Sequence, residues 1–282
     1  MTTAAALDPQ PERGDVAAAL AAARSRADVV AVILAAAGIA WWATVERMTG
    51  MDAGPGTALG TLGWFTGVWT VMMAAMMLPS LAPTAAVVAT LTRRREPTVW
   101  MLFAAGYLLV WSAAGLLAYG LYTLGSDLLA QDLAWRTGGR DFAASVLAVA
   151  AIYELTPPKR ACLLRCRAPL RSVRQSWRDG RARAVEMGAR NGIWCLGCSW
   201  ALMAALFALG VMNLRWMALV ATLVAAQKIG PWRRGTRLAA SGILLALAVT
   251  LAIAPADIPG LVVPSGSGAM HAMNATGSSA VL

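Results

Sequence analysis

The chain has 282 residues, of which 59% are hydrophobic and 13% are charged, and its formal net charge is +10. The charged fraction is well below the roughly 25% of soluble domains, and the mean hydropathy is +0.60, so the composition excludes a soluble globular protein. The excess of lysine and arginine lies beside apolar runs, as the positive-inside rule requires of a membrane protein, and nucleic acid is therefore not an expected partner.

The first segment, residues 1–27, is rich in alanine and carries mixed charges and two prolines. It does not have the basic start, short apolar core and cleavage site of a signal peptide. We therefore predict a cytoplasmic, partly disordered leader.

Seven apolar segments follow, each near the roughly 20 residues that a helix needs to cross the hydrocarbon core of a bilayer. The predicted spans cover residues 28–45, 62–91, 98–122, 141–157, 192–212, 214–230 and 236–254. We therefore expect an all-α, polytopic transmembrane helical bundle of about seven spans over residues 28–254.

Basic residues mark every second connection between these spans. The connections at 46–61 and 123–140 and the tail at 255–282 are instead poor in lysine and arginine. Since cytoplasmic loops carry the excess of basic residues, we predict an internal N-terminus, an external C-terminus and a multi-pass protein of the inner (plasma) membrane. The basic cytoplasmic loop is predicted at 158–191, and the tail is expected to be flexible and extracytoplasmic.

Four methionines fall within six residues of the second predicted span, just before Pro79: Met72, Met73, Met76 and Met77. Residues four apart share a helix face, so this spacing predicts two adjacent columns of thioethers. Thioethers are soft, neutral ligands that favour Cu(I), and a neutral ligand costs little to bury in hydrocarbon. The alternative is that these flexible side chains fill gaps between packed helices.

The first cysteine pair, Cys162 and Cys166, follows the fourth predicted span, and its two thiols converge if this stretch is helical. Neighbouring lysines and arginines are expected to lower the pKa of both thiols and so to favour thiolates that bind metal. Glu154 lies near the inner end of the same span, where an ionisable side chain is a candidate functional residue. Its alternative role is an ion pair with Lys159 or Arg160.

The second pair, Cys195 and Cys198, forms a C-x-x-C motif at the cytoplasmic end of the fifth predicted span. The predicted topology puts all four cysteines on the cytoplasmic side, where their thiolates would form one site for Zn(II) or Cu(I). The motif is shared with thiol oxidoreductases, although no βαβ pattern surrounds it here. A further alternative is that the thiols are inert and bind nothing.

Two polar residues, Gln227 and Lys228, close the sixth predicted span. We expect Lys228 to extend its ammonium group to the inner membrane surface. The amide of Gln227 is expected to bond across helices.

The histidine of the chain, His271, lies between Met270 and Met273 in the tail that is predicted to be external. Together with Met48 and Met51 of the first external loop, these side chains would capture copper outside the membrane. The alternative is a flexible glycine- and serine-rich tail whose methionines and histidine have no metal role.

Three motifs keep an order and spacing that resemble those of a known family. They are Trp69-x-x-Met72-Met73-x-x-Met76-Met77-x-Pro79-Ser80-x-x-Pro83, Tyr153-x-x-Thr156-Pro157-x-Lys159-x-x-Cys162-x-x-x-Cys166-Arg167-x-Pro169 and Gly192-x-x-Cys195-x-Gly197-Cys198-x-Trp200-x-x-Met203. Over about residues 28–235 the chain resembles the bacterial integral membrane proteins of domain of unknown function 2182 (DUF2182), which are predicted to bind metal. This chain has Ser199 and Gln227 where that family commonly has cysteine and glutamate. The resemblance implies a helical membrane fold and metal binding.

Sequence signatures of enzymes are missing, because the chain has no P-loop, no G-x-S-x-G and no H-E-x-x-H motif. Neither an enzymatic role nor a nucleotide cofactor is expected, and an ATP-driven pump within this chain is excluded. The leading hypothesis is a membrane protein that binds or transports Cu(I), with Zn(II) as the other metal considered and a membrane or periplasmic protein as its partner. The alternatives are a non-transporting membrane scaffold or anchor subunit, and a membrane thiol oxidoreductase that uses Cys195 and Cys198.

Overall fold

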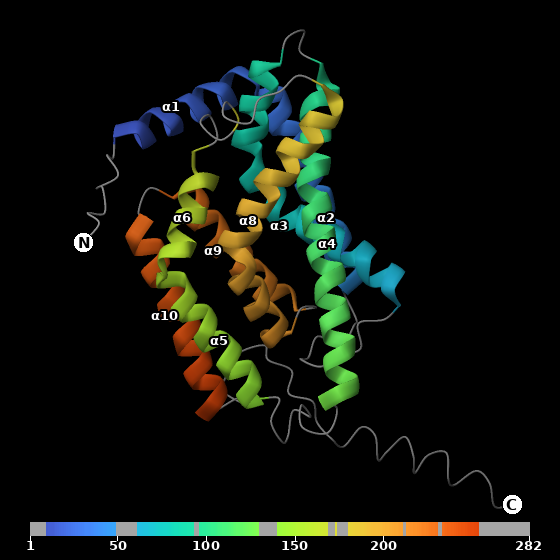
Figure 1. Cartoon of the computed structure of the whole chain (residues 1–282), viewed down its shortest axis with the longest axis vertical. Coiled ribbons are helices and arrows are strands. Elements are labelled where there is room, and N and C mark those ends of the chain that lie inside the picture. The colour runs from blue at the N-terminus through green and yellow to red at the C-terminus, as the bar shows by residue number, and fades with distance from the viewer. Residues whose placement is uncertain are drawn as a thin grey trace, which may run out of the picture.

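The computed structural model describes residues 10–48, 61–92, 96–129, 140–168, 173, 180–210, 213–230 and 233–253. Within these residues the fold consists of helices and contains no strand (Figure 1). The helices are α1 (Gln10–Ser25), α2 (Ala27–Met48), α3 (Leu62–Leu91), α4 (Pro97–Leu129), α5 (Arg140–Leu155), α6 (Pro157–Cys166), α8 (Arg181–Leu209), α9 (Leu214–Ile229) and α10 (Arg233–Ile253). The predicted all-α class is confirmed.

Five helices in the described residues are long and apolar enough to cross a membrane: Ala27–Met48, Leu62–Leu91, Pro97–Gly125, Arg181–Leu209 and Arg234–Ile253. They coincide with the first, second, third, fifth and seventh predicted spans. The fourth and sixth predicted spans correspond to α5 and α9, which have 16 residues each. A helix of that length reaches about 24 Å, less than the roughly 30 Å of the hydrocarbon core. The multi-pass membrane fold is therefore confirmed, whereas seven remains a prediction for the number of spans.

α3 lies at the centre of the bundle. In its most apolar window 72% of the residues are buried, compared with 22% in α2 and in α10. A helix that is apolar on all sides is expected to lie inside a bundle, and α3 keeps its helical path through Pro79 and Pro83. The central position of α3 places its methionine-rich turns among several other helices.

The neighbours in the bundle follow the order α2, α3, α4, α8, α5 and α10, each packed against the next. α5 and α10 run side by side along one flank (Figure 1), where Ser241 Oγ donates to Ala151 O at 2.9 Å. The short helices α6 and α9 both pack against α8. Four other helices, α4, α5, α6 and α9, therefore pack around α8.

Large apolar side chains cover the outward faces of the peripheral helices: Ile39, Trp42, Leu117, Leu121 and Ile253 are each more than 60% exposed. A soluble protein rarely exposes so many large apolar groups in extended patches. Contact of these faces with lipid accounts for them, as expected of a membrane bundle.

α8 begins at Arg181, well before residue 192, where the fifth span was predicted to start. The reason is tertiary packing rather than hydropathy, because Ala184 is fully buried and Gly188 lies against the backbone of α4. A Cβ atom on Gly188 would lie 1.9 Å from Phe103 O. Small residues allow helices to approach this closely, and this contact extends the helix into the predicted loop at 158–191.

The part of the predicted leader that the structure describes is helical and packs on α3. Between α1 and α2, Arg26 Nη1 donates to Ala89 O at 2.5 Å. This bond satisfies a carbonyl in the last turn of α3, where a cationic side chain also interacts favourably with the helix dipole. α1 is thereby joined to the end of the central helix.

Candidate functional site

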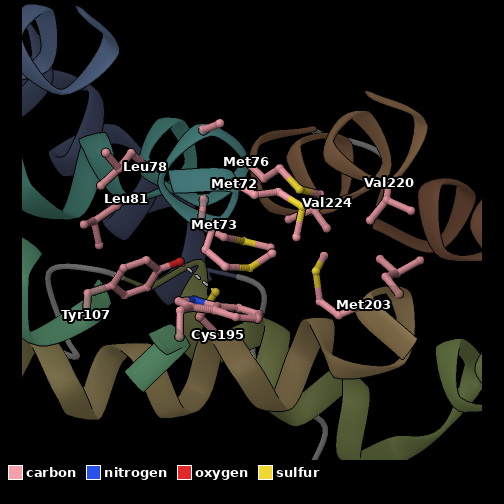
Figure 2. Close-up of a cluster of buried hydrophobic side chains, with 14 of the residues drawn as sticks. Met72, Met73, Met76, Leu78, Leu81, Tyr107, Cys195, Met203, Val220 and Val224 are labelled. Carbon is pink, nitrogen blue, oxygen red and sulfur yellow. Dashed lines mark hydrogen bonds between the residues drawn. The ribbon is translucent and has the colours of Figure 1, made fainter. Parts of the chain in front are cut away.

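The four methionines of α3 are all buried in the apolar core. The exposed fractions are 1% for Met72, 0% for Met73, 3% for Met76 and 0% for Met77. Figure 2 shows Met72 and Met76 directed toward Met203, which projects from α8. Met203 is itself 5% exposed and belongs to the same buried cluster. The column of Met72 and Met76 therefore faces a fifth thioether that was not among the predicted ligands.

Cys195 of α8 belongs to the same buried cluster (Figure 2). Cys195 Sγ is 2.8 Å from Tyr107 OH and accepts a bond from Lys228 Nζ at 2.8 Å. Lys228 Nζ also donates to Ser80 Oγ on α3 at 3.1 Å. The expectation that Lys228 extends to the membrane surface is therefore wrong. Acceptors on α3 and α8 draw its ammonium group inward, because a charged group inside the bundle without hydrogen-bond partners would be costly.

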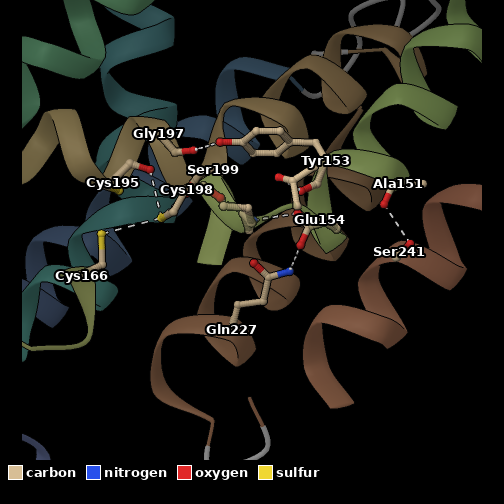
Figure 3. A network of polar contacts seen from close by, with 12 residues as sticks. Ala151, Tyr153, Glu154, Cys166, Cys195, Gly197, Cys198, Ser199, Gln227 and Ser241 are labelled. Atoms are coloured by element: carbon tan, nitrogen blue, oxygen red, sulfur yellow. Dashed lines mark hydrogen bonds and ion pairs between the residues drawn. The ribbon is translucent and has the colours of Figure 1, made fainter. Parts of the chain in front are cut away.

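Cys166 and Cys198 come from different helices and meet. Cys166 is the last residue of α6, and its Sγ lies 3.7 Å from Cys198 Sγ on α8 (Figure 3). Cys198 Sγ also donates to Cys195 O at 3.2 Å and lies 3.4 Å from Ser199 Oγ. The first and second cysteine pairs are thus brought to one place by the packing of α6 on α8.

Cys162 lies one turn earlier on α6 and rests against Gly197. A Cβ atom on Gly197 would lie 3.0 Å from Cys162 Sγ, so the absence of a side chain there makes room for the thiol. Burial raises the pKa of the Cys162 thiol, and the nearby charges of Lys159 and Arg165 lower it by less. The expectation that basic neighbours lower the pKa of this thiol is therefore wrong, because loss of hydration outweighs their attraction.

The four thiols do not form one compact metal site in this arrangement. Among the described residues, no three side chains of histidine, cysteine, aspartate or glutamate lie close enough together to hold a metal ion. The single site of four thiolates expected from the sequence therefore stays a prediction. The structure shows a close pair, Cys166 and Cys198. The side chain of Cys195 interacts with Cys198 and with Lys228, while Cys162 rests against Gly197.

A buried polar network lies beside the thiols (Figure 3). Lys159 Nζ donates to Glu154 Oε1 at 2.7 Å, and both side chains are fully buried. Gln227 Nε2 donates to Glu154 Oε2 at 2.7 Å, while Lys159 also donates to Cys198 O. The ion pair of Glu154 with Lys159 and the bond of Gln227 across helices are both confirmed. Because this network joins α5, α6, α8 and α9, it fixes the backbone of Cys198 relative to three other helices.

A family model described as PpoB2, copper chaperone, matches residues 66–251 of the chain. The chain belongs to this copper chaperone family. The matched region contains the four methionines of α3, Met203 and all four cysteines, and it ends before the tail. Neither the search of curated proteins nor that of solved structures gave a significant match. The family finding supports the copper relation expected from the sequence, whereas the resemblance to DUF2182 remains an expectation.

Within this copper chaperone family member, Arg167 connects the thiol pair to α9. Its Nε donates to Lys228 O at 3.1 Å, and its Nη2 donates to Gly230 O. These carbonyls belong to the end of α9, whose last groups have no partner within the helix. Arg167 belongs to the second of the three family motifs, and nothing in its spacing indicated this role.

Three residues at the site were not among the predicted ligands: Tyr107, Lys228 and Met203. The sequence could have indicated Met203, because Cys195, Ser199 and Met203 follow one another at four-residue intervals and so lie along one face of a helix. Tyr107 had no such signal, since it is an isolated aromatic residue in an apolar span.

Most of the predicted external ligands lie outside the described residues. Met270, His271 and Met273 lie outside the described residues, as does Met51. Met48 is the last residue of α2 and is 5% exposed. The copper-capturing role of the tail therefore stays a prediction, and the family match does not extend to it.

Proposed function

We propose that this protein binds Cu(I) inside the inner (plasma) membrane and transfers it between buried thioethers and a pair of thiols. One observation carries the proposal: the four methionines of α3 share a continuous buried core with Met203 and Cys195 of α8. This core lies within the region that matches a copper chaperone family. An apolar core filled by leucine would pack as well, so sulfur in these positions supports a ligand role.

The thioether group consists of Met72, Met73, Met76 and Met77, with Met203 opposite. Neutral sulfur ligands suit a soft monovalent ion and let it enter the apolar interior without a buried anionic cage. Weak, neutral ligands also release an ion readily to stronger ones. These properties support a transient copper site in the core rather than a storage site.

The accepting group consists of Cys166 and Cys198, with Cys195 beside them as a thiol that belongs to the same buried cluster as the methionines. The 3.7 Å between the two sulfurs is short enough for one ion to bond to both, since metal–thiolate bonds of about 2.3 Å reach across at most about 4.6 Å. Thiolates bind Cu(I) more strongly than thioethers because they carry charge. Copper would move by ligand exchange from the thioethers to the thiolates, which bind it more strongly. A membrane or periplasmic protein would be the partner with which this chain exchanges copper.

Loading experiments with sulfur variants test the proposal. The full-length protein is purified reduced in detergent and loaded anaerobically with Cu(I), and bound copper is measured per chain. We expect stoichiometric copper in the parent protein. Replacing Met72, Met73, Met76 and Met77 by leucine should weaken the binding of copper. A separate variant in which Cys166 and Cys198 are serine should lose more affinity for copper than the methionine variant, because the thiolates are the stronger ligands.

The matched control is Met101→Leu, which removes a thioether from α4 that is 55% exposed and should leave copper binding unchanged. Substoichiometric copper in the parent protein would contradict the proposed function. Full copper retention by both sets of variants would show that copper binds elsewhere in the chain.

A further inference from the structure

The contact between Cys166 and Cys198 has a second chemical consequence. The two sulfurs belong to separate helices and lie 3.7 Å apart. Cys166 is half-buried, whereas Cys198 is 2% exposed. The thiol of Cys166 is therefore accessible to a small reagent, whereas the buried thiol of Cys198 reacts with Cys166 once that reagent has bonded to it.

The remaining thiols have other partners. The side chain of Cys195 also interacts with that of Cys198, but its Sγ is held by Tyr107 OH and Lys228 Nζ, each at 2.8 Å, and these contacts oppose its movement into a bond with Cys198. Cys162 rests over Gly197, where its Sγ lies 3.0 Å from the position that a Cβ atom would take. Bond formation between Cys166 and Cys198 sacrifices only weak contacts of sulfur, which makes this pair the favoured one.

We propose that Cys166 and Cys198 form a reversible disulfide. The bond requires the sulfurs to approach from 3.7 Å to about 2.05 Å. Rotation of the two side chains about χ1 supplies a shift of this size, and Cys166 sits at the end of α6, where no further helical turn restrains it. The C-x-x-C motif is thus not itself the redox pair, and one of its cysteines reacts with a residue 32 positions away.

The oxidant is a low-molecular-weight disulfide such as glutathione disulfide. The thiolate of Cys166 attacks one sulfur of the oxidant, forms a mixed disulfide and releases one thiolate. The thiolate of Cys198 then attacks the sulfur of Cys166, and the second oxidant thiolate leaves. Two protons lost by the protein thiols end on the two released thiols, so the protein is oxidised by two electrons and the oxidant is reduced by two.

The disulfide would act as a switch on copper acceptance, and this consequence rests on the proposed function. A disulfide sulfur is no longer a thiolate and so loses the charge that binds Cu(I). Oxidation should weaken copper binding by about tenfold or more, since even the loss of an outer-shell partner of a metal site costs about that much. The buried thioethers of α3 would be unaffected.

Mapping of the oxidised protein tests the disulfide. Copper-free, full-length protein in detergent is treated with glutathione disulfide, free thiols are alkylated after unfolding, and peptides are analysed by mass spectrometry. Cleavage should avoid arginine, because Cys166 lies between Arg165 and Arg167. We expect a linked Cys166–Cys198 peptide that dithiothreitol releases, that persists in Cys162→Ser/Cys195→Ser and that is lost in Cys166→Ser.

A dominant Cys195–Cys198 or Cys162–Cys166 bond in the parent protein, or four thiols that stay free or carry only glutathione, would overturn the proposal without any variant having to fold. Cu(I) titration of the reduced and oxidised parent protein separates the two proposals. If the disulfide forms but the reduced protein takes up no copper, the redox pair stands and the proposed function fails. If the reduced protein takes up copper and the disulfide does not form, the proposed function stands and the redox pair fails.

Discussion

Replacing Lys159 by methionine is expected to lower the free energy of unfolding by about 3–5 kcal/mol, the cost of removing one partner from a buried ion pair. Lys159 Nζ lies 2.7 Å from Glu154 Oε1, and both side chains are fully buried. In Lys159→Met the carboxylate keeps its bond from Gln227 but loses its counter-charge. The carbonyl of Cys198 also loses a donor, so the thiol pair should be disturbed as well.

The double variant Glu154→Gln/Lys159→Met removes both charges and should recover most of the lost stability, because a neutral pair no longer carries an unpaired buried charge. The matched control is Arg183→Met, since Arg183 and Glu186 form an ion pair at 2.6 Å whose side chains are 47% and 50% exposed. An exposed pair contributes at most about 1 kcal/mol. Unfolding in mixed detergent and dodecyl sulfate micelles measures the free energy of unfolding of all three variants. An equal loss of stability in Lys159→Met and Arg183→Met would contradict this role of the buried network.

Replacing Gly188 by alanine is expected to destabilise the contact of α4 with α8 by about 3 kcal/mol, the upper end of typical overpacking costs. The added Cβ would lie 1.9 Å from Phe103 O, and a backbone carbonyl has no rotamer by which to move away. Helix propensity acts in the opposite direction, because alanine is favoured over glycine by about 1 kcal/mol. The steric term exceeds this gain, so the two helices must separate.

Gly242→Ala on α10 is the matched control for this prediction, since a Cβ there meets no atom within 4 Å. That variant should be neutral or slightly more stable. The midpoint of thermal unfolding in detergent, followed by the loss of the monodisperse peak in size-exclusion chromatography, compares the two. A Gly188→Ala protein as stable as Gly242→Ala would show that α4 and α8 do not pack as closely as described.

Much of the fold could be predicted because a membrane imposes one dominant rule on sequence. Long apolar segments must form helices that satisfy their own backbone groups, and five of the predicted spans are such helices. The boundaries were less predictable. α8 begins at Arg181 because Ala184 and Gly188 pack against α4, and hydropathy does not register packing between two helices.

The candidate site could be predicted where its geometry is local. The four-residue spacing of the α3 methionines indicated a shared helix face, and the proximity of Glu154 to Lys159 in sequence indicated their ion pair. The contact of Cys166 with Cys198 depends on the packing of α6 against α8, which no spacing within one segment encodes. The inward turn of Lys228 likewise depends on Cys195 and Ser80, acceptors on two other helices.

The central claim is that the methionines of α3 bind copper in the membrane interior, and X-ray absorption at the copper edge tests it most directly. The protein is labelled with selenomethionine, loaded anaerobically with Cu(I) and compared with a labelled variant in which Met72, Met73, Met76 and Met77 are leucine. We predict selenium among the nearest neighbours of copper in the parent protein and a clear decrease of that signal in the variant, where Met203 is the one proposed thioether ligand left. Copper surrounded by sulfur, nitrogen or oxygen without selenium, or a selenium signal of equal size in the parent protein and the variant, would contradict the claim.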